Sequence, residues 1–460
     1  MANLAPSWRH GLVVATVALH GCAAASRGPM GPVVSPTGIV YELGTPPVQT
    51  RFSRTAALYL SRGLMDRALQ FAQDGVAADP ANPVHYFLAG LAYARLPDYD
   101  EADRMFTEAQ RIYPAYELDI EPEREAAWAV AYNEGVEFYA NGDLQEAMKA
   151  WSHAATIYDL RPEALRNLAG LLVGQEKYDE AIRAYQRALL GLQRKPATHV
   201  LTADEIQSRE ELTLSTEASL TQIHLFMNRY AEAEPLLRRQ LLRDSTNVQL
   251  RSDLGTALRG LGREVEAGEV YSALLADPRV RAAELSSLGV ALFRAADFGR
   301  ASQAFERLTA LRPNSRDVWF NYANALYAAE AWAALATVGD RLVELDPLGK
   351  KAGLIAARAH LEADDEEAAR RGLERIDSAP VYVEELQMMP FESVTRIQGR
   401  ILGNHAETGR PVRLRFTFYD DAEPLGSETV TVAAPSPGDS TALDVSFAMR
   451  ATGFRYGVIP

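Results

Sequence analysis

Only a few residues of this 460-residue chain combine a reactive side chain with a spacing that chemistry could use. The run 364-DDEE-367 gathers carboxylates, but it lacks the alternating ligand spacing of a calcium loop. Glu384 and Glu385 are adjacent, and such pairs are too common to indicate general acid–base catalysis. The eight histidines lie far apart in the sequence, so they have no metal-ligand spacing.

Sequence motifs of known catalytic sites are missing as well. The chain has no GxSxG nucleophile elbow, no P-loop, no HExxH pair and no dinucleotide-binding glycine motif. We therefore predict no enzyme activity, no catalytic residue, no cofactor, no bound metal and no small-molecule substrate.

Cys22 is the only cysteine, so an intramolecular disulfide or a CxxC site is ruled out. It ends a segment in which Arg9 precedes an apolar run at residues 12–19. This run is too short to cross a bilayer as a helix, which needs about 20 apolar residues. It has the layout of an export signal.

The sequence 19-LHGC-22 resembles the bacterial lipobox, in which the cysteine is lipidated and becomes the first mature residue. Leu19 and Gly21 match that motif, whereas His20 departs from it. The resemblance implies a signal peptide at 1–21 and a membrane anchor at Cys22. Because Ala23 follows instead of aspartate, it also implies an exported protein held at the outer membrane, facing the periplasm. An ordinary signal peptide cut nearby is the alternative.

Residues 22–48 are rich in proline, glycine, alanine and serine and show no periodicity. This composition predicts a flexible tether.

The elements that would follow the tether are helical, because a pattern of small and large residues returns about every 34 residues. The clearest copies occupy 86–114 and 289–313, and matching offsets hold Gly90 and Gly289, Phe106 and Phe305, Pro114 and Pro313. The pattern resembles the tetratricopeptide repeat, a helix–turn–helix unit. The resemblance implies a mostly α, superhelical solenoid in which each unit buries its apolar face against the next.

About eight or nine such units fit between residues 49 and 379. Gly63, Gly142 and Gly262 fall at turns between helices, where a left-handed C-cap favours glycine. An insertion at 195–216 is predicted to lengthen a first helix or to add a loop.

Members of this repeat family usually bind protein partners on the concave face, which the first helices line. Aromatic anchors there commonly carry binding energy. The candidate partner-binding residues at these offsets are Phe87, Leu91, Tyr132, Tyr139, Phe320, Asn324 and Tyr327. The alternative is that these side chains only pack the scaffold. The lysines of the carboxylate clamp found in chaperone-binding relatives do not occur here.

Strand-like alternation replaces the helical period in residues 380–460. In 412-VRLRFTFYD-420, apolar Val412, Leu414 and Phe416 alternate with polar neighbours, and similar runs occur at 394–402, 427–432, 443–449 and 454–458. Five or six short strands predict a small all-β sandwich. The segment 416–439 resembles the FxLYD-type envelope domain, which implies an immunoglobulin-like accessory domain without catalysis.

The formal net charge of −14 argues against nucleic-acid binding. Only five lysines occur, and we interpret the predominance of arginine as codon bias.

These features together imply a membrane-anchored scaffold of the bacterial cell envelope that binds unidentified proteins. A pilotin-like assembly factor for a secretin or type IV pilus is one alternative, because such lipoproteins carry the same repeats. A glycan or peptidoglycan binder is another, with Tyr382, Tyr419 and Tyr456 as possible stacking residues.

Overall fold

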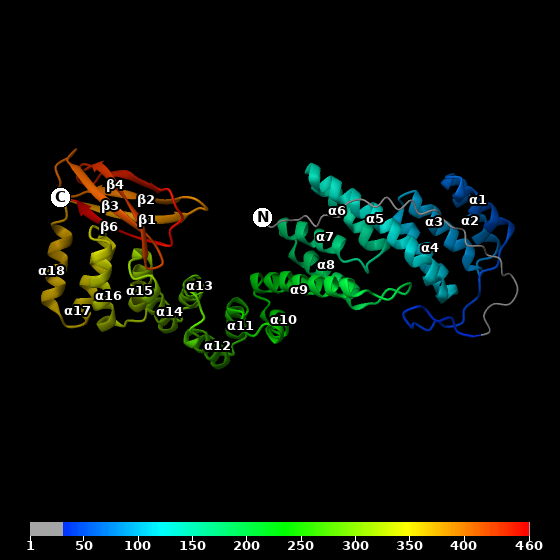
Figure 1. The fold of residues 1–460 in the computed structure, drawn as a ribbon, viewed down its shortest axis with the longest axis horizontal. Coiled ribbons are helices and arrows are strands. Elements are labelled where there is room, and N and C mark those ends of the chain that lie inside the picture. The colour runs from blue at the N-terminus through cyan, green and yellow to red at the C-terminus, as the bar shows by residue number, and fades with distance from the viewer. Residues whose placement is uncertain (1–30, 460) are drawn as a thin grey trace. The chain divides into compact units, whose positions relative to one another are not determined.

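The computed structural model describes residues 31–459 (Figure 1). Cys22 and the signal-peptide segment lie outside the described residues. The chain divides into two compact units, with the boundary between Met227 and Asn228.

The regular secondary structure of the N-terminal unit is helical. Its elements are α1 (Arg51–Ser61), α2 (Met65–Ala78), α3 (Pro83–Arg95), α4 (Tyr99–Ile112), the short 3₁₀ helix η1 (Pro114–Tyr116), α5 (Glu117–Asn141), α6 (Leu144–Ile157), α7 (Glu163–Gly174), α8 (Tyr178–Gln193) and α9 (Ala203–Phe226).

The C-terminal unit continues with helices and ends in strands. Its helices are α10 (Tyr230–Arg243), α11 (Val248–Gly260), α12 (Glu264–Ala276), α13 (Ala282–Arg294), α14 (Phe298–Leu311), α15 (Arg316–Ala328), α16 (Trp332–Leu345), α17 (Lys350–Glu362) and α18 (Glu366–Asp377). Its strands are β1 (Val381–Pro390), β2 (Thr395–Gly403), β3 (Pro411–Asp420), β4 (Glu423–Ala433), β5 (Ser440–Phe447) and β6 (Gly453–Ile459).

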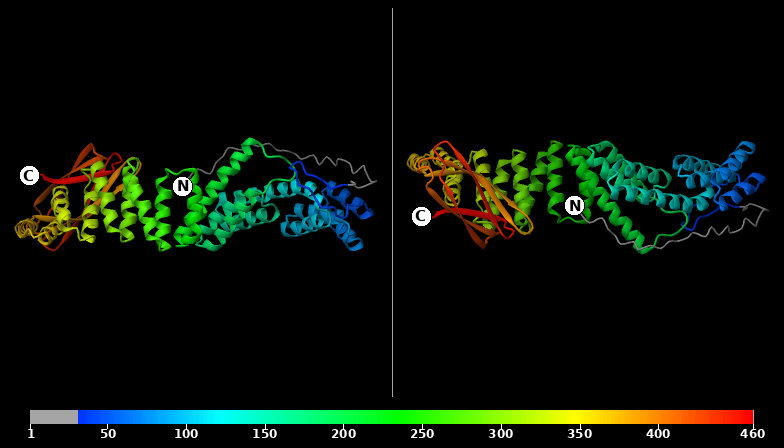
Figure 2. Two further views of the ribbon diagram at one scale, coloured as in Figure 1. Left: turned by 90° about the horizontal axis from the view of Figure 1, so that it is seen from below. Right: turned by 90° about the horizontal axis from the view of Figure 1, so that it is seen from above.

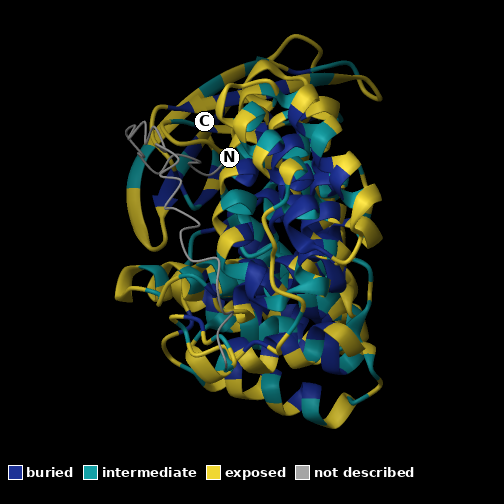
Figure 3. Cartoon of the chain, turned by 90° about the vertical axis from the view of Figure 1, so that its right-hand side faces the viewer, coloured by how far each residue is buried: buried dark blue, intermediate teal, exposed yellow. Residues whose placement is uncertain are grey.

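Successive helices stack side by side within each unit (Figure 2). In several helix pairs, a glycine of the first helix lies against a large ring of the second helix. A Cβ added to Gly90 would come within 2.6 Å of Phe106, and one added to Gly289 within 2.8 Å of Phe305. Buried residues accordingly lie on the packed sides of the helices (Figure 3). The small and large residues of the repeat pattern are therefore those at which two helices pack closely.

The turns inside the helix pairs share one backbone conformation. Gly63, Gly142 and Gly262 have φ values of 74°, 86° and 74°, which confirms the left-handed turns predicted there. The equivalent turns hold residues other than glycine in several pairs, including Ala296 at 58° and Glu330 at 55°. The turn geometry is thus imposed by the repeat, even where the residue type does not favour it.

The predicted flexible tether is wrong for residues 33–48. Val34 and Val40 form an antiparallel bridge, and the Tyr41 side chain is buried. The Thr45 N–H donates to the Ile112 carbonyl at 3.0 Å, and the Val48 N–H donates to Asn82 Oδ1 at 3.2 Å. These hydrogen bonds and one buried ring hold this segment against the end of α4 and the start of α3.

The insertion produces both of the outcomes considered from the sequence. A loop follows α8, and α9 is then lengthened to 24 residues. The buried Glu121 carboxylate of α5 fixes the loop: it accepts from the Ala197 N–H at 2.7 Å and from the Thr198 hydroxyl at 2.9 Å. The insertion is therefore anchored to the helices that precede it.

The C-terminal strands form two three-stranded antiparallel sheets, with the orders β1-β2-β5 and β4-β3-β6. Phe416, Phe418 and Phe454 are fully buried among the apolar residues of both sheets. The predicted alternation in 412–418 is confirmed. The sequence did not predict strand β1, because two charged residues interrupt the apolar alternation of 381-VYVEELQMMP-390. The pairing of β1 with β2 shifts its register at the same place, between Glu384 and Gln387.

This β domain packs directly on α15 to α17. The Tyr456 hydroxyl donates to Asp346 Oδ1 at 2.6 Å and accepts from the Leu348 N–H at 3.1 Å. Arg316 holds the other Asp346 oxygen at 2.8 Å, and the Val383 N–H donates to the Leu348 carbonyl at 2.9 Å. The sandwich and the last helix pairs are thus joined by a buried cluster of hydrogen bonds.

Core packing accounts for two of the three tyrosines considered for stacking on sugars, and the third is partly covered. Tyr456 and Tyr419 are buried, and Tyr382 lies under the Lys350 ammonium at 4.9 Å with its hydroxyl donating to the Ile376 carbonyl.

Candidate functional site

The candidate site consists of the exposed faces of the first helices, and it is described separately in each unit. Its residues occupy three offsets from the small residue that packs against the second helix. Phe87, Tyr132 and Phe320 precede that residue by three positions, Leu91 and Asn324 follow it by one, and Tyr139 and Tyr327 follow it by four. These offsets lie on one side of a helix.

The residues at the first offset are committed to packing. Phe87 on α3 stacks on Tyr116 of η1, with ring centroids 5.1 Å apart. Tyr132 on α5 stacks on Trp128 at 4.8 Å, and its hydroxyl accepts from Asn167 Nδ2 of α7 at 3.5 Å. Burial raises the pKa of the Tyr132 phenol. Phe87 and Tyr132 therefore have little surface left for a partner.

Phe320 at the first offset, and Asn324 and Leu91 at the second, are also at least partly covered. The Arg316 guanidinium lies 4.7 Å from the centre of the Phe320 ring. Asn324 is half-buried on the same face of α15, and in the other unit Leu91 is buried. The structure thus places these three residues at the edge of the core.

Tyr139 and Tyr327 differ from the other candidates because both are 44% exposed. Each also rests on a tryptophan of the following second helix: Tyr139 is 5.8 Å from Trp151, and Tyr327 is 5.3 Å from Trp332 in an edge-to-face contact. A tyrosine held on one side and open on the other can bury a large area on binding at a small cost in side-chain entropy.

Two further features of this surface were missed in the sequence. Val136, one position after Gly135, is 42% exposed beside Tyr139. On α7, a Cβ added to Gly170 or Gly174 would meet nothing within 4 Å, so the backbone there is open. The signal was available, because Val136 and Tyr139 have helical spacing, as do Asn167, Gly170 and Gly174. We call Val136, Tyr139, Gly170 and Gly174 the α5–α7 surface.

In the C-terminal unit, a hollow of about 140 Å³ lies between the first helices α11 and α13. Its lining combines apolar and polar residues: Val248, Gln249, Ser252, Ala283, Glu284, Ser287 and Leu288. It therefore offers space on the first-helix face without a charged or reactive group aimed into it, apart from the Glu284 carboxylate that already accepts from Arg281 at 2.8 Å.

A larger hollow of about 480 Å³ lies between the loop after α12, helix α14 and Asp421 of the β domain. Its arginines already have partners: Arg279 bonds Asp277 at 2.8 Å, Arg281 bonds Glu284, and Arg307 donates to the Asp277 carbonyl at 3.1 Å. An anionic ligand would have to displace these contacts.

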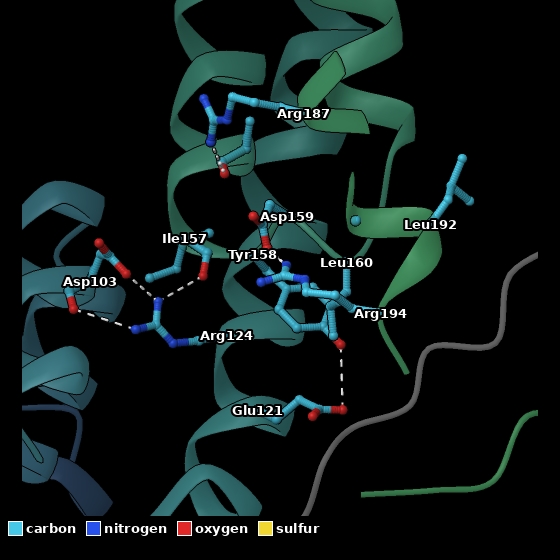
Figure 4. A network of polar contacts seen from close by, with 12 residues as sticks. Asp103, Glu121, Arg124, Ile157, Tyr158, Asp159, Leu160, Arg187, Leu192 and Arg194 are labelled. Atoms are coloured by element: carbon cyan, nitrogen blue, oxygen red, sulfur yellow. Dashed lines mark hydrogen bonds and ion pairs between the residues drawn. The ribbon is translucent and has the colours of Figure 1, made fainter. Parts of the chain in front are cut away.

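Arginine side chains support the scaffold beneath these faces (Figure 4). Arg124 donates to the Ile157 carbonyl at 2.9 Å and Arg187 to the Ala155 carbonyl at 3.1 Å, at the C-terminal end of α6. Arg209 donates likewise to the Gly191 and Leu192 carbonyls at the end of α8, at 2.9 Å each. The carbonyls at a helix C-terminus lack partners within the helix, and a cation there is stabilising. The interpretation of the arginines as codon bias alone is therefore wrong for these positions.

Residues 31–459 contain no group of three His, Cys, Asp or Glu side chains placed to hold a metal ion. Among the helices α1 to α18, none combines the length and apolar character that crossing a bilayer requires.

Models of the tetratricopeptide repeat match residues 132–197, 222–282 and 287–350, and a second model of this repeat matches 86–116. The matched segments coincide with helix pairs, so the chain contains tetratricopeptide repeats. Its fold is a solenoid of these repeats followed by a small antiparallel β domain. Repeats of this class typically act as non-catalytic scaffolds for protein–protein interaction.

Several solved structures are similar to parts of the chain. The structure described as "MamA MSR-1 C2" is 18% identical, covers 36% of this chain and 94% of its own, and has a TM-score of 0.27. A MamA structure from Desulfovibrio magneticus RS-1 is 18% identical with 35% and 92% coverage and a TM-score of 0.27. A further MamA crystal structure is 15% identical with 40% and 91% coverage and a TM-score of 0.29. No curated protein matches the chain.

Proposed function

We propose that this protein is a membrane-anchored scaffold of the bacterial cell envelope that binds protein partners through the first helices of its repeats. The observation that carries the proposal is the equivalence of Tyr139 and Tyr327. They occupy the same offset in two repeats, rest on a tryptophan, and share an exposure of 44%. Exposed aromatic side chains on a rigid element are typical anchors of protein interfaces.

Membrane anchoring at Cys22 is the second part of the proposal. Support comes from the lipobox-like 19-LHGC-22 sequence after a short apolar run. Two or three acyl chains would hold the chain stably, whereas a single chain binds only marginally. Ala23 favours the outer membrane over retention at the inner membrane, with the repeats facing the periplasm.

Partner binding can be tested by affinity capture of the full chain from detergent-solubilised envelopes after mild crosslinking. We expect one stoichiometric protein that is lost with Tyr139→Ser or Tyr327→Ser and kept with the matched control Leu242→Ser on the second helix α10. Equal recovery with all variants would contradict binding through the first helices. Recovery of a secretin would identify the pilotin-like role, and recovery of cell-wall fragments alone would identify a glycan binder.

Anchoring is tested independently. Metabolic labelling with a fatty acid should label the wild-type chain and leave Cys22→Ser unlabelled and released from the membrane fraction. Identical fractionation and mobility of the two proteins would exclude a lipid anchor at this position.

A further inference from the structure

The segment at residues 33–43 has an unusual surface for a connecting segment. Residues 31–50 contain a single charged side chain, Glu42, whereas 23% of the whole chain is charged. Val34, Val40 and Leu43 are 55%, 62% and 70% exposed, and Ile39 is exposed as well. We call residues 33–43 the apolar hairpin; its colour in Figure 1 is dark blue.

The fold itself presents these aliphatic side chains to the outside. The Ser35 N–H donates to the Ile39 carbonyl at 2.8 Å, and the Tyr41 N–H donates to the Val33 carbonyl at 2.9 Å. The Ser35 hydroxyl accepts from the Ile39 N–H at 2.9 Å, and Gly38 turns the chain at a φ of 85°. With Ser35 and Tyr41 buried, the neighbouring valines, isoleucine and leucine point away from the protein.

Leaving several aliphatic side chains in water is unfavourable, because burying apolar surface is favourable in proportion to its area. A hairpin held in shape with such a surface marks an interaction site. Its position in the chain identifies the partner. Val34 follows Cys22 by twelve residues, which can span at most about 40 Å. A lipid anchor at Cys22 would therefore keep the hairpin beside the bilayer.

We propose that the apolar hairpin inserts its aliphatic side chains into the surface of the lipid bilayer and so fixes the N-terminal unit against the membrane. This inference rests on the proposed anchor for its geometry. The near absence of charge on residues 31–50 suits the headgroup–acyl boundary, where the binding would come from buried apolar area. Binding should consequently change little with salt concentration.

The test uses the full mature chain carrying Cys22→Ser, which cannot be lipidated, with vesicles of phosphatidylethanolamine and phosphatidylglycerol. We expect measurable partition into vesicles and at least a tenfold loss with Val34→Asp, Val40→Asp and Leu43→Asp combined. The control variant combines Leu242→Asp and Val265→Asp, which are 87% and 78% exposed in the C-terminal unit, and should bind as the parent does.

A second measurement locates the contact. Since Cys22 is the only cysteine, Val40→Cys in the Cys22→Ser chain accepts a single environment-sensitive dye. We expect its emission to shift to the blue on addition of vesicles, whereas the same dye at Leu242→Cys should not respond.

Three results would overturn the proposal. They are no partition of the parent chain, equal partition of the hairpin variant, and a dye shift at Val40 that rises with protein concentration without vesicles, which would make a second copy of this chain the occupant. Failure here leaves the lipid anchor unaffected, because labelling of the wild-type chain in cells tests that separately.

Discussion

Glycine shows most clearly how single residues shape this fold. Gly142 is favoured by its left-handed backbone, because its φ is 86° although a side chain there would meet no other atom. Gly289 is required for a different reason, because the ring of Phe305 packs directly against it. Both kinds of position could be predicted, because only glycine suits them well. The equivalent turns at Glu176, Ala296 and Glu330 could not, since their residue types do not favour positive φ.

A pair of glycine substitutions separates these effects. Gly142→Ala should lower the free energy of unfolding of its repeats by about 1 kcal/mol, because alanine is strained at positive φ. Gly170→Ala, inside α7 and equally free of steric contact, should raise it by about 0.5–1 kcal/mol through helix propensity. Denaturant midpoints measure both, and a shift in the same direction for the two variants would contradict the assigned backbone roles.

The binding candidates show the limit of prediction at this scale. The sequence placed Phe87, Tyr132 and Tyr139 at correct helical offsets, but it could not tell which rings would be covered. Phe87 is covered because Tyr116 of η1 stacks on it, and Tyr132 because Trp128 does. Tyr116 lies between two helix pairs, and Trp128 lies one turn before Tyr132 on α5, so neither ring belongs to the three offsets of the candidate site. The spacing of the candidates alone could not reveal these contacts.

At the scale of elements, the periodic helices were predictable and the segments between them were not. Residues 33–48 lack any period, and their composition suggested flexibility, yet hydrogen bonds to Ile112 and Asn82 hold them. Likewise, the loop before α9 gains its position from one buried carboxylate, Glu121. Contacts between residues 76 and 77 positions apart leave no local sequence signal.

Replacement of Glu121 should release this loop. In Glu121→Ala, the Ala197 N–H and the Thr198 and Tyr158 hydroxyls lose their acceptor, and we expect faster amide hydrogen exchange and proteolysis at residues 194–202. The half-buried neighbour Glu123, whose carboxylate pairs with Arg95 at 3.4 Å and not with the loop, serves as the control when it is replaced in the same way. Unchanged exchange in the loop of Glu121→Ala would show that other contacts hold it.

At the scale of the whole molecule, the sequence correctly predicted repeats followed by a β domain, but it did not predict which residues join them. The contact depends on Tyr456, Asp346 and Arg316, which come from separate parts of the chain and meet in a buried cluster. Nothing in their local sequence distinguishes them from residues packed within one domain. The β domain is thus a packed extension of the last repeats.

Because of this contact, the free energy of unfolding should depend on pH in the alkaline range. Burial and the neighbouring Asp346 raise the pKa of the Tyr456 phenol well above its usual value of about 10. Above pH 10, the unfolded tyrosine loses its proton while the folded one keeps it, so the stabilisation is complete below pH 10 and declines as the pH rises further.

Tyr456→Phe should reduce that decline, to which other tyrosines with raised pKa values such as Tyr158 also contribute, and should lower stability by about 1–3 kcal/mol at neutral pH, because Asp346 loses a buried donor. Unfolding curves at pH 8 and pH 11 for the wild type, Tyr456→Phe and the exposed control Tyr327→Phe provide the comparison. An equal pH response of wild type and Tyr456→Phe would contradict this role for the cluster.

The most direct test of a first-helix binding surface is site-specific photo-crosslinking in living cells. A photoreactive phenylalanine analogue would replace Tyr139 or Tyr327 on first helices, and Leu190 or Leu242 on second helices, where exposures are 61% and 87%. The proposed scaffold function predicts a discrete protein adduct from the tyrosine positions and none from the leucine positions. Adducts only from Leu190 or Leu242, or equally from all four positions, would contradict it.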